Sequence, residues 1–145
     1  MTLRSTSRDH ETLPLRYREQ QSNAQKLADY FKNHKEVTNV IHPSQFSGLD
    51  KERADKYMHT GYGPLLGIEL KGGESAGRKL IDNLKMIYHV ANIGDVRTLA
   101  IHPASTTHSQ LTKTEQLAAG VTPGYVRFSV GIEHIDDIIA DIEQA

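Results

Sequence analysis

Two sets of apolar residues along the chain recur at positions i, i+3, i+4 and i+7. The sets are Ala24, Leu27, Ala28 and Phe31 near the N-terminus, and Ile135, Ile138, Ile139 and Ile142 at the C-terminus. This spacing aligns the side chains of each set on one face of an α-helix. We therefore predict an amphipathic helix at each end of the chain.

The start of the first helix is predicted from Thr12 and Pro14. Thr12 can act as the N-cap, and Pro14 suits the first turn because its missing N–H would have no helical partner there. We place the end of this helix at Asn33 and His34. The segment before it is polar and has no periodicity, so residues 1–11 are expected to form a disordered leader or the remnant of a truncated reading frame.

Five short segments have the composition of β-strands. They span residues 37–42, 65–70, 88–91, 98–102 and 125–130. Within the second of them, Leu66, Ile68 and Leu70 alternate with Gly67 and Glu69, as in a strand with one apolar face. The sequence thus contains enough strands for a small sheet.

Three shorter helices are predicted between the strands. The first covers the charged residues 50–58, and the second follows Ser75, which can act as its cap. The third begins with the capping box Thr112-x-x-Glu115 and ends at Gly120. Helices and strands therefore alternate irregularly along the chain.

This order of elements indicates an α+β fold, with helices packed on one face of a small, mainly antiparallel sheet. Residues 12–145 are expected to form one domain, since a chain of 145 residues has the usual size of a single domain. Each predicted strand has one apolar face and one mixed face. We expect the mixed face of the sheet either to be solvated or to dock against a partner.

The residue that calls for a chemical explanation is Arg127, inside the strand predicted at 125–130. Side chains of a strand alternate between its two faces, so Tyr125, Arg127 and Ser129 share the face opposite to the apolar set. A guanidinium on that face can bind a carboxylate through two parallel hydrogen bonds. The alternative is that Arg127 forms a surface ion pair with an acidic neighbour, which contributes little to stability.

Other kinds of site have weaker support in the sequence. His102 and His108 are five residues apart in a loop, and no cysteine or cluster of carboxylates completes a metal site around them. Ser105 and His108 lack the motif and the orienting acid of a hydrolase. Gly72-Gly73 lacks the pattern of a phosphate-binding loop. We expect these histidines to bond to backbone groups or water, and we expect no metal.

Composition excludes several classes of partner. The net charge is −1 and no basic stripe is present, so we expect no nucleic-acid partner. The N-terminus has no apolar core of a signal peptide, and no apolar run is long enough to span a bilayer. The absence of cysteine is compatible with a reducing compartment. We therefore expect a soluble, cytoplasmic protein.

Three longer motifs of the chain resemble those of one enzyme family. They are ETLPLR, ANIGDVRTLAIHPASTTHSQL and EQLAAGVTPGYVRFSVGIEHIDDIIADIEQA. The chain, from about Glu11 onward, is similar to the C-terminal domain of the cystathionine gamma-synthase and methionine gamma-lyase family of pyridoxal-phosphate (PLP) enzymes. The motifs look most like those of its O-acetylhomoserine sulfhydrylase subfamily.

The resemblance implies a substrate site without the cofactor-binding lysine. Arg127 matches the arginine that binds the substrate carboxylate in this family, Asn92 would lie beside that carboxylate, and Thr107 would line the site. The family lysine lies in a Ser-x-Thr-Lys motif followed by Gly-His, and Thr112-Lys113 is only a look-alike of it. The tyrosine that stacks on PLP and the phosphate loop belong to the family's large domain.

The resemblance therefore predicts a C-terminal fragment that binds the amino-acid substrate and is inactive alone. PLP is expected in the full-length parent, and no bound cofactor is expected on this chain. The fragment should self-associate or dock against a PLP-binding domain. The alternative is an independent small-molecule-binding or protein-interaction module with the same fold.

Overall fold

The computed structural model describes residues 3–145 of the protein, which form five strands, five α-helices and two short 3₁₀ helices. The elements are α1 (Leu3–Lys32), β1 (Val37–Ile41), η1 (Pro43–Gln45), α2 (Gly48–Tyr57), β2 (Leu65–Leu70), α3 (Gly73–Asn83), β3 (Tyr88–His89), β4 (Leu99–Ile101), η2 (Pro103–Ser105), α4 (Lys113–Ala118), β5 (Tyr125–Ser129) and α5 (Ile135–Glu143). All five predicted strand segments contain a strand.

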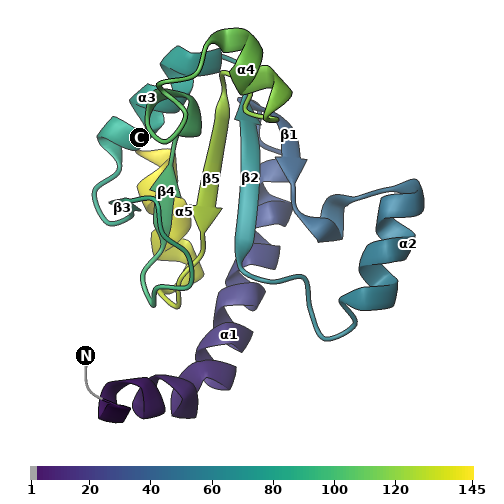
Figure 1. The fold of residues 1–145 in the computed structure, drawn as a ribbon, viewed down its shortest axis with the longest axis vertical. Helices are drawn as coiled ribbons and strands as arrows, with labels where there is room; N and C mark the ends of the chain where they lie inside the picture. Colours follow the sequence, from purple (N-terminus) through teal and green to yellow (C-terminus); the bar gives the residue numbers. More distant parts are fainter. Residues whose placement is uncertain (1–2) are drawn as a thin grey trace.

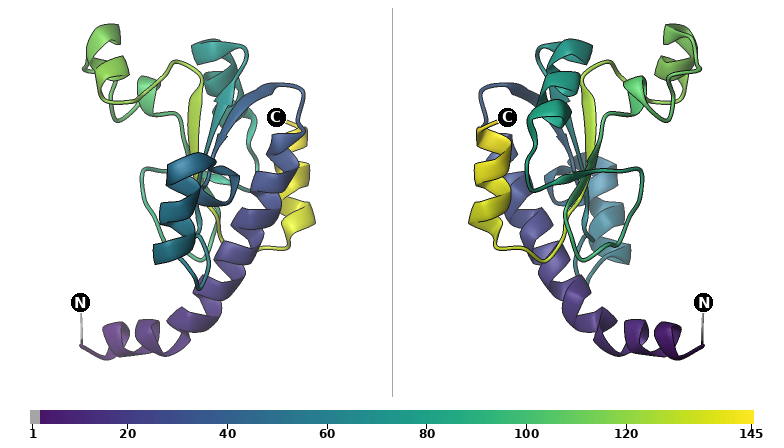
Figure 2. Two further views of the ribbon diagram at one scale, coloured as in Figure 1. Left: turned by 90° about the vertical axis from the view of Figure 1, so that its right-hand side faces the viewer. Right: turned by 90° about the vertical axis from the view of Figure 1, so that its left-hand side faces the viewer.

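The strands form one sheet in the order β1-β2-β5-β4-β3 (Figure 1). β1, β2, β5 and β4 pair antiparallel, and β3 pairs parallel with β4. α1 and α5 lie against one side of the sheet, α4 lies on the other side, and α2 lies beyond the edge strand β1 (Figures 1 and 2). The predicted α+β class with a mainly antiparallel sheet is confirmed, but α2 and α4 do not join the helical layer.

The main core lies between the sheet and the layer of α1, α3 and α5. Its helical residues include the predicted stripe of α1, in which the side chains of Ala24, Leu27, Ala28 and Phe31 are at most 2% exposed. Val126 and Phe128 of β5 fill the centre of the same core and are fully buried. Burying side chains of this size contributes about 1.5–3 kcal/mol each, so the apolar face of β5 has a fixed orientation.

The structure corrects two predicted helix starts. α1 begins at Leu3 and not at Thr12, so residues 3–11, which were expected to form a disordered leader, are helical and Pro14 lies inside the helix. α1 changes direction in its N-terminal part (Figure 2), as expected where a proline removes a backbone hydrogen bond. The N-cap of α3 is Gly72 and not Ser75. The capping box at Thr112 is present as predicted.

Candidate functional site

Arg127 lies in β5, the middle strand of the sheet. Its neighbours in register are Gly67 of β2 and Ile101 of β4. Arg127 shares its face with Tyr125 and Ser129, because Val126 and Phe128 point into the main core. The arginine side chain is half-buried, so it is fixed by its surroundings and remains accessible to a small molecule.

Tyr125 and Gly67 form one wall beside Arg127. A Cβ atom at Gly67 would lie 2.5 Å from Cε2 and 2.8 Å from the hydroxyl oxygen of Tyr125. The ring of Tyr125 therefore crosses to the neighbouring strand and covers Gly67. Burial raises the pKa of Tyr125, and the positive charge of Arg127 partly offsets this effect. The phenol is thus a neutral hydrogen-bonding group on the face that carries Arg127.

The guanidinium of Arg127 is only partly used by the protein. Nη2 donates a hydrogen bond of 3.2 Å to the backbone carbonyl of Asn92. Nε is buried and has no hydrogen-bond partner among the described residues. A buried N–H without a partner is unfavourable by about 1–3 kcal/mol, which favours a ligand that accepts from it.

The surface ion pair that the sequence left open for Arg127 is not formed. Among the described side chains, which are those of residues 10–145, no carboxylate lies in ion-pair distance of its guanidinium. The two register partners of Arg127 on this face, Ile101 and Gly67, carry no charge. The carboxylate of Glu69 on the same face bonds to Thr122 and Gly124. The positive charge therefore lacks an acidic protein partner in the described part of the chain.

Asn92 lies in the loop that connects β3 and β4. Its side-chain Oδ1 accepts a hydrogen bond of 2.9 Å from the N–H of Ile93, which shapes a tight turn. Gly94 continues this turn with φ of 76°, in the left-handed region that suits glycine. The side chain of Asn92 is exposed, and its backbone carbonyl accepts the hydrogen bond from Arg127. Asn92 therefore belongs to the candidate site.

The structure does not join Thr107 to the other two predicted site residues. Thr107 lies beyond η2, is exposed, and its hydroxyl is 2.9 Å from Nδ1 of His108. In the described residues, no hydrogen bond connects it to Arg127 or Asn92. Arg127 and Asn92 are thus the pair that the fold brings together.

The predicted role of His102 as a hydrogen-bonded residue is confirmed. Its ring is fully buried, with Nδ1 2.8 Å from Oγ of Ser105 and Nε2 2.8 Å from the carbonyl of Pro123. Both ring nitrogens are therefore occupied by protein groups. Across the described side chains of residues 10–145, no group of three or more His, Asp and Glu side chains is arranged to hold a metal ion.

The lysines of the chain lie at its surface, and each of them is at least partly exposed. The look-alike Lys113 has a side chain that is 62% exposed and forms an ion pair with Glu74 of α3. We therefore assign no step of catalysis to a cofactor bound by this chain.

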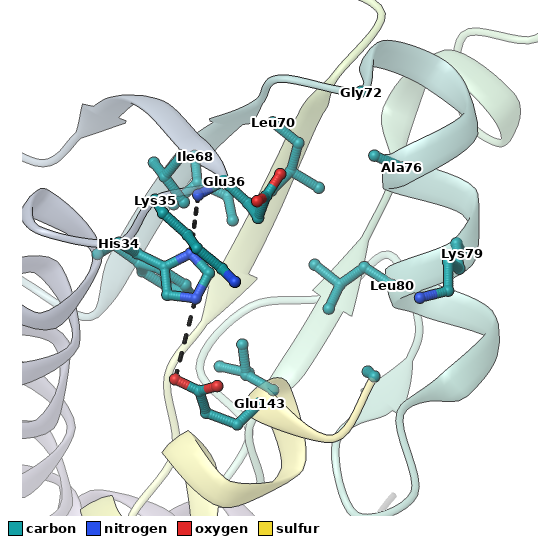
Figure 3. A pocket seen from close by; sticks show the side chains of 14 residues that line it. His34, Lys35, Glu36, Ile68, Leu70, Gly72, Ala76, Lys79, Leu80 and Glu143 are labelled. Atoms are coloured by element: carbon teal, nitrogen blue, oxygen red, sulfur yellow. Dashed lines mark hydrogen bonds and ion pairs between the residues drawn. The ribbon is translucent and has the colours of Figure 1, made fainter.

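A pocket lies on the opposite face of the sheet from Arg127. It has a volume of about 410 Å³ and is lined by residues of α1, β1, β2, α3 and α5. Figure 3 shows His34 and Glu143 on one side and Lys79 of α3 on the other. His34 Nε2 lies 3.9 Å from Glu143, which also accepts a hydrogen bond from the hydroxyl of Tyr30. Among the described residues, no buried polar atom without a hydrogen-bond partner lines this cavity, so Arg127 is the better candidate.

Two site-shaping residues, Gln20 and Ser129, are missed by the sequence analysis. Gln20 is 3% exposed and its Nε2 donates to the carbonyl of Asp95 at 2.7 Å. Ser129 is 1% exposed and its Oγ accepts from the N–H of Gly94 at 3.1 Å. A signal for Gln20 exists, because it precedes Ala24 by four residues and so shares the apolar stripe of α1. A polar residue within a buried stripe indicates a buried hydrogen bond.

Comparison with known proteins shows which sequences are similar to this chain. The sequence model described as "Cys/Met metabolism PLP-dependent enzyme" matches residues 4–145. "Sulfhydrylase FUB7" of Fusarium oxysporum f. sp. lycopersici is 50% identical over 135 residues, which are 93% of this chain and 31% of that protein. "O-acetyl-L-homoserine sulfhydrylase" of Leptospira meyeri is 48% identical over 136 residues, or 93% of this chain and 31% of that protein.

A solved structure shows the same fold. The crystal structure of a putative O-acetylhomoserine (thiol)-lyase from Campylobacter jejuni, which contains N'-pyridoxyl-lysine-5'-monophosphate, matches with a TM-score of 0.85 and 37% sequence identity. The match covers 92% of this chain and 32% of that chain. This chain therefore spans about a third of the length of the relatives that it matches. No helix among residues 3–145 is long and apolar enough to cross a membrane.

Proposed function

The chain belongs to the Cys/Met metabolism family of PLP-dependent enzymes, and we propose that it acts as the C-terminal, substrate-binding part of an O-acetylhomoserine sulfhydrylase. Such an enzyme exchanges the acetate of O-acetylhomoserine for sulfide and yields homocysteine and acetate. The proposal is supported by the sulfhydrylases of Fusarium oxysporum and Leptospira meyeri, which are 50% and 48% identical to the chain.

One observation carries the assignment of a role within that enzyme. Arg127 has a buried Nε–H without a partner and an Nη2 that is held by the carbonyl of Asn92. The guanidinium is therefore held in place by Asn92, and its other donors have no hydrogen-bond partner among the described residues. An arginine edge matches the two oxygens of a carboxylate. We assign Arg127 to the α-carboxylate of the amino-acid substrate.

Asn92 and Thr107 have supporting roles in this proposal. Asn92 fixes the guanidinium through its carbonyl, and its exposed side-chain amide can donate to the same carboxylate. Thr107 lies in the loop beyond η2, and we place it at the wall of the substrate pocket of the assembled enzyme. None of these residues makes or breaks a bond. They bind and orient the substrate so that the reacting atoms meet the cofactor.

The proposal requires a PLP-binding partner for the mixed face of the sheet. In the relatives, about two-thirds of the sequence lies outside the region that matches this chain. Ile41 and Leu65 lie on the same face as Arg127 and are 42% and 41% exposed. Exposed apolar side chains next to a charged group suit a protein interface that closes around a small polar substrate. The cofactor would be supplied by that partner.

A hybrid enzyme tests this proposal directly. In it, the matching third of the Leptospira meyeri sulfhydrylase is replaced by residues 10–145 of this chain, and the sulfide-dependent release of acetate from O-acetyl-L-homoserine is measured. We expect turnover by the hybrid enzyme and none by this chain alone. The Arg127→Ala variant of the hybrid should keep its PLP absorbance and lose most of its kcat/KM. A folded, PLP-loaded hybrid whose turnover does not depend on Arg127 would contradict the proposal.

A further inference from the structure

The loop that carries Asn92 is fastened to the rest of the domain on both of its sides. On the strand side, the N–H of Gly94 donates to Oγ of Ser129 in β5 at 3.1 Å. On the helix side, the carbonyl of Asp95 accepts from Nε2 of Gln20 in α1 at 2.7 Å. These two bonds hold the C-terminal half of the turn, whose first residue, Asn92, accepts the hydrogen bond from Arg127.

Both fastening side chains are buried, whereas the turn that they hold is exposed. Gln20 and Ser129 are 3% and 1% exposed, but Asn92, Ile93 and Gly94 are all exposed. An exposed turn has few apolar contacts to fix its conformation, so its order depends on such bonds. Both bonds are part-buried, and each ties a backbone group of the exposed turn to a side chain that the packed domain holds in place.

Ser129 also lies two residues from Arg127 on the same face of β5. A shift of the turn at Gly94 is therefore transmitted to the bond between Asn92 and Arg127, because both bonds join the same loop to the same strand. Gln20 controls the loop from the other side through Asp95. Its backbone belongs to α1, which is anchored in the main core by Ala24 and Leu27.

We propose that Gln20 and Ser129 are positioning residues for the carboxylate-binding arginine. They hold the Asn92–Asp95 turn so that its carbonyl keeps the guanidinium of Arg127 in the orientation that a carboxylate requires. The inference rests on the proposed function of Arg127 and adds a helix α1 residue to the site. According to this inference, α1 helps to orient Arg127 for substrate binding through the bond between Gln20 and Asp95.

The test compares two buried amides on the same face of α1. Gln20→Met removes the bond to Asp95 with little change of shape. The matched control is Asn23→Leu, because Asn23 is 1% exposed and donates to the carbonyls of Gly131 and Glu133, outside the turn. In the hybrid enzyme, we expect Gln20→Met to raise KM for O-acetyl-L-homoserine about 3- to 10-fold with kcat within about twofold, and Asn23→Leu to leave KM within about twofold. Ser129→Ala should behave like Gln20→Met.

A second measurement on the full 145-residue chain does not depend on activity. Amide hydrogen exchange at Gly94 should accelerate at least about tenfold in Gln20→Met but not in Asn23→Leu, beyond any change in global stability. Equal exchange at Gly94 in both variants, or equal changes in KM, would show that Gln20 is merely structural and would overturn the inference. If Arg127→Lys leaves KM unchanged while Gln20→Met loosens Gly94, the proposed function fails and the fastening of the turn stands.

Discussion

The ring of Tyr125 lies over Gly67, so closely that a Cβ atom at Gly67 would be 2.5 Å from the ring. The two residues lie on adjacent strands, and Gly67 is also the register partner of Arg127. The absence of a side chain at Gly67 therefore lets the tyrosine ring pack beside the arginine. The space around Arg127 is determined by this pair as well as by the loop at Asn92.

Gly67→Ala should destabilise the protein because the added methyl group must displace the ring of Tyr125. We expect a decrease of about 1–2 kcal/mol in the free energy of unfolding, typical of overpacking against a side chain that can partly move. Urea denaturation of the chain measures it. In a Tyr125→Val background the same substitution should be nearly neutral, which gives a coupling of about 1 kcal/mol in the double-mutant cycle. Equal effects in both backgrounds would exclude this steric relationship.

Arg127→Lys should impair substrate binding although the positive charge is kept. Lysine lacks the planar pair of donors, so KM for O-acetyl-L-homoserine in the hybrid enzyme should rise at least about tenfold, equivalent to about 1.4 kcal/mol. Steady-state kinetics at saturating sulfide provide the measurement. A normal KM in the lysine variant would remove the argument for two-point recognition.

Arg127→Ala should affect the stability of the isolated chain much less than it affects binding. The arginine is outside the main core and has no acidic partner among the described residues, so we expect a change of no more than about 0.5–1 kcal/mol. Thermal and urea unfolding of the chain test this expectation. Loss of the folded state in this variant would assign Arg127 a structural role.

Asp141 should contribute more to stability than any exposed acid of α5. Its carboxylate is buried and accepts backbone N–H bonds of 2.9 Å from Lys85, Met86 and Ile87, the segment that follows α3. Asp141→Asn replaces one acceptor oxygen by a donor that faces an N–H, so we expect a loss of about 1.5–3 kcal/mol in urea denaturation. The control is Asp137→Asn in the exposed first turn of α5, which should lose no more than about 1 kcal/mol. Similar losses in the two variants would contradict this role.

The link between α3 and α4 should depend on pH in the acid range. Hydrogen bonds from Lys113 and then Arg78 hold the pKa of Glu74 at about 2, below its ordinary value of 4.5. A carboxyl with a lowered pKa in the folded state stabilises that state above pH 4.5, and the contribution disappears as the pH falls toward 2. Urea midpoints measured across this range should therefore fall less steeply for Glu74→Gln than for the wild type. Identical slopes would show that these bonds do not persist in solution.

Much of the fold followed from local pattern. The stripes in α1 and α5, the alternation of Leu66 and Ile68 in β2, and the capping box at Thr112 all lie where the sequence predicted them. Such features depend on the 3.6- and 2-residue periods of the backbone, which the sequence displays directly. The face occupied by Arg127 followed from the same rule.

Other features depended on groups that are distant along the chain. Helix α1 extends to Leu3 although Pro14 interrupts its pattern, and α2 and α4 lie outside the helical layer. The polar residues Asp141 and Gln20 can be buried because they form hydrogen bonds with backbone groups of Ile87 and Asp95. These partners lie 54 and 75 residues away along the chain. Propensity and spacing carry no information about such partners.

The sequence by itself determined the class of the fold, the apolar face of each main element and the choice of Arg127 as the residue to explain. Only the tertiary structure decided that Asn92 binds this arginine while Thr107 does not, and that Gln20 and Ser129 hold the turn between them. The physical reason is that periodicity fixes which way a side chain points, whereas its hydrogen-bond partners are set by how loops and helices meet after the core has packed.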